Sequence, residues 1–261
     1  MRKDGENGRI TILIVTHKPY ELPEADGYRP IQVGGQPQID AGYLRDNTGE
    51  NIAEKNGTFC ELTALYWAWK NLDAGVLGLC HYRRYLGYRK AGKMKRERLL
   101  TEEEVRNLLE QADIILPKKR HYWIETREGQ YAHAHHIEDL KCTEEVLEEK
   151  HPDFLPAWKH MLGTRSGHIC NMFIARREVA DEYCEWLFDV LFEVEKRLDI
   201  SEYSANDKRV FGFLGERLLD VWVETKGLQI AEVPMINLDR QHWIRKGTEF
   251  LRRKFEHKEK K

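Results

Sequence analysis

The sequence predicts an α/β fold in which a mixed sheet is flanked by helices, and two observations support this. Short apolar runs rich in β-branched residues alternate along the chain with longer segments of helical periodicity. The first 85 residues contain strand, helix and strand in that order, which is the unit of a parallel α/β sheet. The 261 residues, 41% of them hydrophobic, suffice for one core. We expect one domain over residues 1–244 and a basic tail over 245–261.

In the first half, strands are expected over residues 9–16, 28–33 and 76–80, with a helix over 59–72. Alternating β-branched residues define the first strand, and Pro19 follows its end. Thr58 and Glu61 have the spacing of a capping box, which would open the helix. Apolar residues then recur with helical spacing, so one face of this helix should pack on the sheet.

In the second half, helices are expected over 101–111, 143–151, 154–161, 178–198 and 208–225, and strands over 112–116, 168–175 and 228–233. Residues 118–136 are polar, aromatic and rich in histidine, without clear periodicity. A long irregular segment of this kind is often a mobile lid over an active site. We therefore expect ligand contacts there.

Composition limits the function and the compartment. Forty-two basic residues against 44 acidic ones give a net charge of −2, which argues against a general nucleic-acid-binding protein. Five cysteines without CxxC spacing indicate a reducing compartment, and no apolar run approaches the roughly 20 residues of a membrane span. We expect a cytoplasmic protein, with the basic tail as a candidate contact to the inner face of the membrane.

The most informative segment is VLGLCHYRRY at residues 76–85. Its apolar half predicts a buried strand, and His81, Arg83 and Arg84 then emerge at the carboxyl end, where open α/β sheets bind ligands. Two guanidinium groups suit a phosphate or a carboxylate. A basic surface turn is the alternative interpretation.

The chain resembles the DUF4422 family, which is regarded as a group of GT-A-type glycosyltransferases from bacterial capsular and exopolysaccharide gene clusters. The resemblance covers roughly residues 10–240, and the HYRRY and GFLGERL segments together are its most specific part. It implies a GT-A-like, Rossmann-like domain and a nucleotide-sugar donor, with galactose or galactofuranose transfer among some members.

A GT-A enzyme must neutralise the negative charge of the donor diphosphate, commonly with a divalent metal held by a D-x-D motif. No D-x-D follows strand 76–80. Either Arg83 or Arg84 replaces the metal, which we favour and which requires no cofactor, or His81 binds Mn²⁺ or Mg²⁺ with a distant carboxylate. The HAHH run at 133–136 lacks zinc-site spacing.

The remaining candidates follow from the resemblance and from residue chemistry. Donor contacts are expected from a polar set that also has ordinary roles in turns and strand ends, namely Thr16, His17, Asp46, Asn51, Asn56 and Arg209. Acceptor or sugar contacts are expected from Tyr131, His135, His136 and Asn171. Inverting transfer needs a carboxylate base, for which Glu216, Asp207 and Asp220 are the candidates, although Glu216 could equally be a solvated helix residue.

These features predict a glycosyltransferase that moves a hexose from a UDP-sugar to a lipid-linked or oligosaccharide acceptor in surface polysaccharide synthesis. The alternative is a non-catalytic nucleotide-sugar or polysaccharide-binding subunit that retains the fold. The charged residues at several strand ends favour the enzyme.

Overall fold

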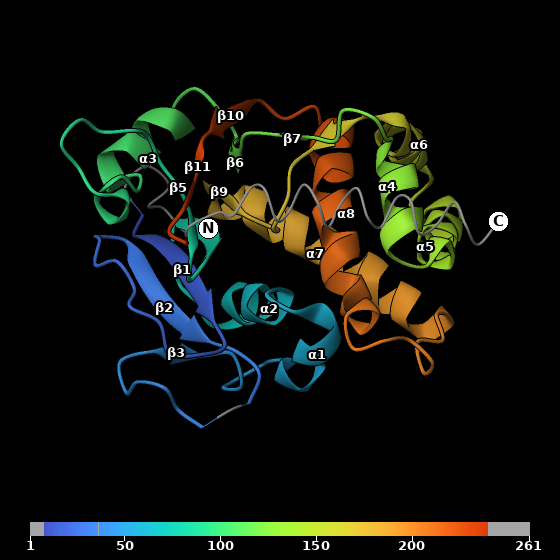
Figure 1. Cartoon of the computed structure of the whole chain (residues 1–261), viewed down its shortest axis with the longest axis horizontal. Helices are drawn as coiled ribbons and strands as arrows, with labels where there is room; N and C mark the ends of the chain where they lie inside the picture. The colour runs from blue at the N-terminus through green and yellow to red at the C-terminus, as the bar shows by residue number, and fades with distance from the viewer. Residues whose placement is uncertain (1–7, 36, 240–261) are drawn as a thin grey trace.

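The computed structural model describes residues 8–35 and 37–239, which form a layered α/β fold around a mixed sheet (Figure 1). The main path of the sheet has the order β10-β6-β9-β4-β1-β2-β3. These strands are β1 (Ile10–Thr16), β2 (Tyr28–Gln32), β3 (Leu44–Arg45), β4 (Val76–His81), β6 (Ile114–Pro117), β9 (Phe173–Arg176) and β10 (Ile230–Val233). β5 (Arg84–Leu86) pairs with β4 and with β11 (Met235–Asn237), while β7 (Arg120–His121) and β8 (Ser166–Gly167) form a separate ribbon. The expected mixed α/β class is confirmed.

Strand β1 lies at the centre and runs parallel to both of its neighbours, β2 and β4. β9 is antiparallel to β4 and β6, which makes the sheet mixed. Alternate residues of β1 enter different cores: Leu13 packs on one face, whereas Ile12 and Ile14 pack on the other. All seven residues of β1 are buried, as expected for a central strand covered on both sides.

Helices cover both faces of the sheet (Figure 1). The α-helices are α1 (Asn56–Phe59), α2 (Leu62–Asn71), α3 (Glu102–Leu109), α4 (Arg127–Ala134), α5 (Ile137–Lys150), α6 (Leu155–Gly163), α7 (Arg177–Arg197) and α8 (Val210–Lys226), and the 3-10 turns are η1 (Ala53–Lys55), η2 (Lys95–Glu97), η3 (Pro152–Phe154) and η4 (Asp207–Arg209). Buried residues of α3 share a core with Ile12 and Ile174. Buried residues of α2, α7 and α8 form the larger core on the opposite face, and α4 to α6 pack beside α7 and α8.

The structure corrects three expected elements. The helix expected over 59–72 is interrupted at Cys60, whose φ of 53° stops α1 before α2 begins. The strand expected over 168–175 is limited to 173–176, because Cys170 and Asn171 both have positive φ. Residues 127–134 of the expected irregular segment form α4, whose N-cap Thr126 accepts a hydrogen bond from the Gly129 amide.

The described part of the chain, residues 8–35 and 37–239, contains no helix that is both long and apolar enough to cross a bilayer. The expected basic tail, residues 245–261, lies outside the described residues.

Candidate functional site

A cavity of about 560 Å³ opens at the carboxyl ends of β1 and β4. Because these strands are parallel neighbours, their ends meet at one edge of the sheet, where such folds bind ligands. Its polar lining residues are His17, Lys18, Asn56, Cys60, Glu61, His81, Tyr82, Arg83, Arg84, Cys170, Arg209 and Glu216. Segments far apart in the chain therefore build it: the ends of β1 and β4, α1 with the start of α2, the turn at Cys170, and η4 with the first half of α8.

Four cationic side chains line the cavity. Arg83 forms an ion pair with Asp239 at 3.1 Å, so part of its charge is already compensated. The Arg84 side chain lines the cavity and forms no ion pair or hydrogen bond with residues 8–35 and 37–239, so its guanidinium is open to an anionic ligand. Arg209 donates from Nε to Cys60 Sγ at 3.2 Å and lies 5.3 Å above the ring of Phe213, and Lys18 completes the set.

Two carboxylates also line the cavity. Glu216 Oε1 accepts a hydrogen bond from the Cys170 amide at 2.8 Å, and Glu61 Oε1 accepts one from Asn171 Nδ2 at 2.8 Å. Burial raises the pKa of Glu216, with a further contribution from the charge of Glu61, against the lowering effect of Arg217. A carboxyl group shifted upward and facing a cavity is suited to accept a proton.

His81 is engaged within the protein. Its Nε2 lies 2.6 Å from the carbonyl oxygen of Cys170, so this nitrogen must carry the proton and donate. The nearest carboxylate oxygen, Glu61 Oε1, is 3.8 Å away. Across residues 8–35 and 37–239, no group of three or more His, Cys, Asp or Glu side chains is arranged to hold a metal ion. The contact with the Cys170 carbonyl leaves Nδ1 as the His81 nitrogen that could accept a proton or bind a cation.

Backbone strain is concentrated at the cavity wall. Cys60, Cys170 and Asn171 have φ values of 53°, 74° and 49°, which residues other than glycine rarely adopt. Such conformations cost about 1–3 kcal/mol each and tend to occur at functional sites. The Asn171 side chain links the two strained segments because its Nδ2 donates to Glu61, the residue after Cys60. The same Nδ2 also donates to the Gly212 carbonyl of α8 at 3.0 Å.

Two glycines let α8 approach these strained segments. A Cβ at Gly215 would lie 2.9 Å from Asn171 Oδ1, and one at Gly212 would lie 3.2 Å from Cys60 Sγ. The GFLGERL segment therefore combines close packing at its glycines with a cavity-facing carboxylate at Glu216.

Of the donor residues predicted near the first strands, His17 and Asn56 line the cavity. Asn56 also donates to the Cys60 carbonyl at 2.8 Å, and partial burial together with the Lys18 charge lowers the pKa of His17. The other three predicted residues are placed in local structure. Thr16 donates to the Lys18 carbonyl, Asp46 accepts from Thr63 at 2.6 Å, and Asn51 bonds its own turn through Gly49 and Ala53.

The predicted acceptor residues of 118–136 gather in a separate cluster. Tyr131 is fully buried and donates to Asp139 at 2.6 Å. His135 stacks on Phe213 with ring centroids 4.2 Å apart, and its Nδ1 lies 3.0 Å from Asp207 Oδ1. His136 stacks on Tyr203 at 4.0 Å. Asp207, predicted as a base, is thus held by hydrogen bonds to Ser204 and to His135, and these contacts lower its pKa. None of Tyr131, His135, His136 and Asp207 lines the cavity.

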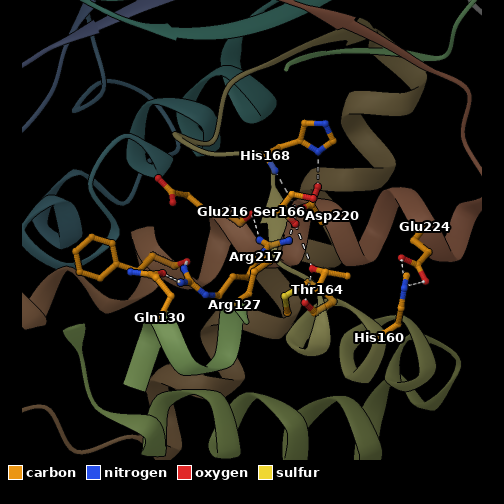
Figure 2. Close-up of polar contacts among 12 residues, drawn as sticks. Arg127, Gln130, His160, Thr164, Ser166, His168, Glu216, Arg217, Asp220 and Glu224 are labelled. Carbon is orange, nitrogen blue, oxygen red and sulfur yellow. Dashed lines mark hydrogen bonds and ion pairs between the residues drawn. The ribbon is translucent and has the colours of Figure 1, made fainter. Parts of the chain in front are cut away.

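A buried ionic network lies along α8 beyond Glu216 (Figure 2). Asp220 contacts the Arg127 guanidinium and the His168 ring, and it also accepts from the His168 amide at 3.2 Å. Burial alone would raise the pKa of Asp220, but hydrogen bonding to His168 and the Arg127 charge outweigh it and lower that pKa. Arg127 also donates to the Glu216 carbonyl at 3.4 Å, so the network helps to fix the backbone that carries Glu216.

Among the charged residues of the cavity, Glu61 and Lys18 are the two that the sequence did not single out as site residues. Glu61 was expected to cap a helix with Thr58, but that prediction is wrong, because Thr58 donates to the Lys55 carbonyl and Glu61 accepts from Asn171. No local signal separates the two roles, since a glutamate three residues after a threonine suits both.

The family model described as a domain of unknown function, DUF4422, matches residues 11–227. The chain belongs to the DUF4422 family. Its structure is similar to a solved chain described as the apo structure of the WbbM bifunctional glycosyltransferase, with a TM-score of 0.80 and 29% identity. The match covers 88% of this chain and 45% of that one, so this DUF4422 protein spans less than half of WbbM's length. No curated protein matches the sequence.

Proposed function

We propose that this DUF4422 protein is a glycosyltransferase that moves a hexose, such as galactose or galactofuranose, from a UDP-sugar to a saccharide acceptor. The observation that carries the proposal is the cavity at the ends of β1 and β4. It joins cationic side chains with a carboxylate of raised pKa, within a fold similar to a bifunctional glycosyltransferase.

The cationic side chains would bind the donor diphosphate. Negative charge grows on this group as the sugar leaves, and fixed cations stabilise it without a metal. Arg84 and Arg209 are the best placed, because neither has a carboxylate partner within the described structure, whereas Arg83 is paired with Asp239. His17 and Asn56, at the edge of the same cavity, would contact the nucleoside.

Glu216 would act as the base in an inverting transfer. Its pKa is raised by burial, and the amide of Cys170 holds Oε1 in place, so the carboxylate is oriented before the acceptor arrives. The hydrogen bond from Asn171 to Glu61 holds the neighbouring part of the cavity wall in place. An acceptor hydroxyl between Glu216 and the anomeric carbon would lose its proton to Glu216 as the new bond forms.

We also propose the acceptor class and the cellular location of the enzyme. The family resemblance supports a lipid-linked or oligosaccharide acceptor in bacterial surface polysaccharide synthesis and a cytoplasmic enzyme.

Calorimetric titration of UDP into the wild type and into Arg84→Ala/Arg209→Ala tests the donor site, each in EDTA and in Mn²⁺. The wild type should bind UDP in EDTA, and the double variant should bind at least about 100-fold more weakly, since each charge-assisted contact is worth about 1.5–3 kcal/mol. Arg89→Ala, an exposed arginine outside the cavity, is the matched control and should bind as the wild type does.

Binding that requires Mn²⁺ would overturn the metal-free arrangement. No UDP binding under any condition would overturn the donor assignment. UDP binding without transfer to any saccharide in an acceptor panel would favour the non-catalytic binding subunit instead.

A further inference from the structure

The segment between β6 and α4 exposes an aromatic and aliphatic tip among basic residues. Trp123 and Ile124 are 79% and 54% exposed, and they are two of the four large hydrophobic residues that are exposed among the described ones. Lys118, Lys119 and Arg120 precede them and are exposed as well. Isolated exposed apolar residues need no explanation, but an adjacent pair inside a basic surface does.

The backbone holds Trp123 outward. The Ile124 amide donates to the Tyr122 carbonyl at 2.6 Å, which closes a three-residue turn around Trp123, and Trp123 has a φ of 57°. A bulky residue in this region of φ is strained and persists only where surrounding contacts enforce it. Arg165 enforces it from the neighbouring segment, since its carbonyl accepts from the Tyr122 amide at 2.8 Å and its Nη1 donates to the Trp123 carbonyl at 3.4 Å.

The charge near the tip is mainly basic. Lys118, Lys119, Arg120 and Arg165 form no ion pair with any of the described residues 8–35 and 37–239. The neighbouring carboxylate, Glu125, is 11% exposed and lies 3.2 Å from His133. Lys118, Lys119 and Arg120 therefore lead into the tip along the chain, and Arg165 contacts it directly. Lys119 also lines a hollow that contains Asp220 and Glu224, and Glu128 is an exposed carboxylate just beyond the tip.

We propose that the tip and its four cations, residues 118–124 with Arg165, dock the protein on an anionic lipid membrane. Tryptophan favours the headgroup level of a bilayer, an isoleucine beside it reaches the acyl boundary, and basic residues are attracted by anionic headgroups. A single-stranded nucleic acid would need a groove of stacking rings that follows its backbone. A projecting tip with an aliphatic residue is better suited to a membrane.

The docking surface adjoins the candidate active site. β7, which precedes the tip, pairs with β8 with Arg120 opposite Gly167, and Cys170 of the cavity lies three residues farther along. If the proposed function holds, this placement would bring the cavity close to the membrane that carries a lipid-linked acceptor. Membrane binding itself does not depend on that function.

Co-sedimentation of the full chain with vesicles tests the proposal. Vesicles of phosphatidylcholine with one third phosphatidylglycerol should bind the protein at least about tenfold more tightly than pure phosphatidylcholine, and added salt should weaken binding. Trp123→Ser/Ile124→Ser should weaken binding about tenfold or more. Lys119→Gln/Arg120→Gln should weaken it about fivefold per residue, from about 1 kcal/mol for each cation.

The matched control is Met94→Ser/Arg89→Gln, which removes a 70% exposed apolar residue and an exposed cation elsewhere, and it should bind vesicles as the wild type does. Wild-type binding by the Trp123→Ser/Ile124→Ser variant would overturn the proposal and assign the contact to another segment, such as residues 245–261. The proposal would also be overturned if the wild type did not bind vesicles. The same holds if these variants lost binding to a thymidine oligonucleotide but kept their binding to vesicles. UDP titration of the same variants checks that they are folded. If the wild type itself does not bind UDP, the vesicle comparison still tests membrane docking, because docking does not depend on the proposed function.

Discussion

Replacing Asp220 by asparagine tests the buried ionic network along α8 (Figure 2). The substitution keeps the shape of the side chain but removes its charge. The Arg127 side chain is 4% exposed and that of His168 is 1% exposed, so solvent cannot compensate the guanidinium once Asp220 is neutral. Removing one partner of a buried pair costs about 3–5 kcal/mol. This loss is a large part of the 5–15 kcal/mol that typically stabilises a domain.

Urea unfolding followed by tryptophan fluorescence measures the loss. Glu224→Gln is the matched control on the same helix, because Glu224 and His160 form a largely exposed pair at 2.8 Å, worth about 0–1 kcal/mol. Adding Arg127→Met to Asp220→Asn should recover much of the loss, since it removes the uncompensated cation. A loss below about 1 kcal/mol in Asp220→Asn, with an unchanged denaturant slope, would refute the reasoning.

Three further outcomes are expected. Because the pKa of Asp220 is lowered in the folded protein, its stabilisation is complete above its ordinary value of 3.8 and is lost as the pH falls through the lowered pKa. The stability difference between wild type and Asp220→Asn should therefore close in acid, and a constant difference would contradict the pairing. Glu216→Gln should lower the turnover rate about 10²–10⁴-fold while UDP binding persists, and the wild-type rate should rise with pH through the raised pKa of Glu216. Tyr131→Phe should cost about 1–3 kcal/mol in urea unfolding, by removing a donor from buried Asp139, without changing UDP affinity. Weaker UDP binding in that variant would contradict this expectation and show that Tyr131 contributes to the donor site rather than to the predicted acceptor site.

Strand 76–80 and the polar residues that follow it were predictable from the sequence. A run of buried apolar residues that stops at a basic cluster predicts where the strand ends and which edge of the sheet the cluster occupies. Lys18, which follows β1, reaches the same cavity as Arg84 for the same reason, since parallel neighbouring strands end at one edge.

The helical periodicity of residues 59–72 concealed the break at Cys60. Periodicity reports which side chains face the core, and it does not report the φ angle of a residue between two segments that share one apolar face. The same holds for Asn171, which looked like a polar residue in a buried strand and in fact bridges Glu61 and the α8 backbone.

The sequence by itself determined the α/β class, the central strands and the basic edge of the sheet, because these depend on local apolar patterns. Only the tertiary structure decided which polar residues share the cavity. Glu61, Glu216 and Arg84 are brought together there by contacts between segments far apart in the chain, whereas Tyr131 and Asp207 turn into a separate hydrogen-bonded cluster. The cavity and the separate cluster contain the same kinds of side chain, a carboxylate and its polar neighbours. Only the long-range packing of the chain decides which of these residues reach the cavity.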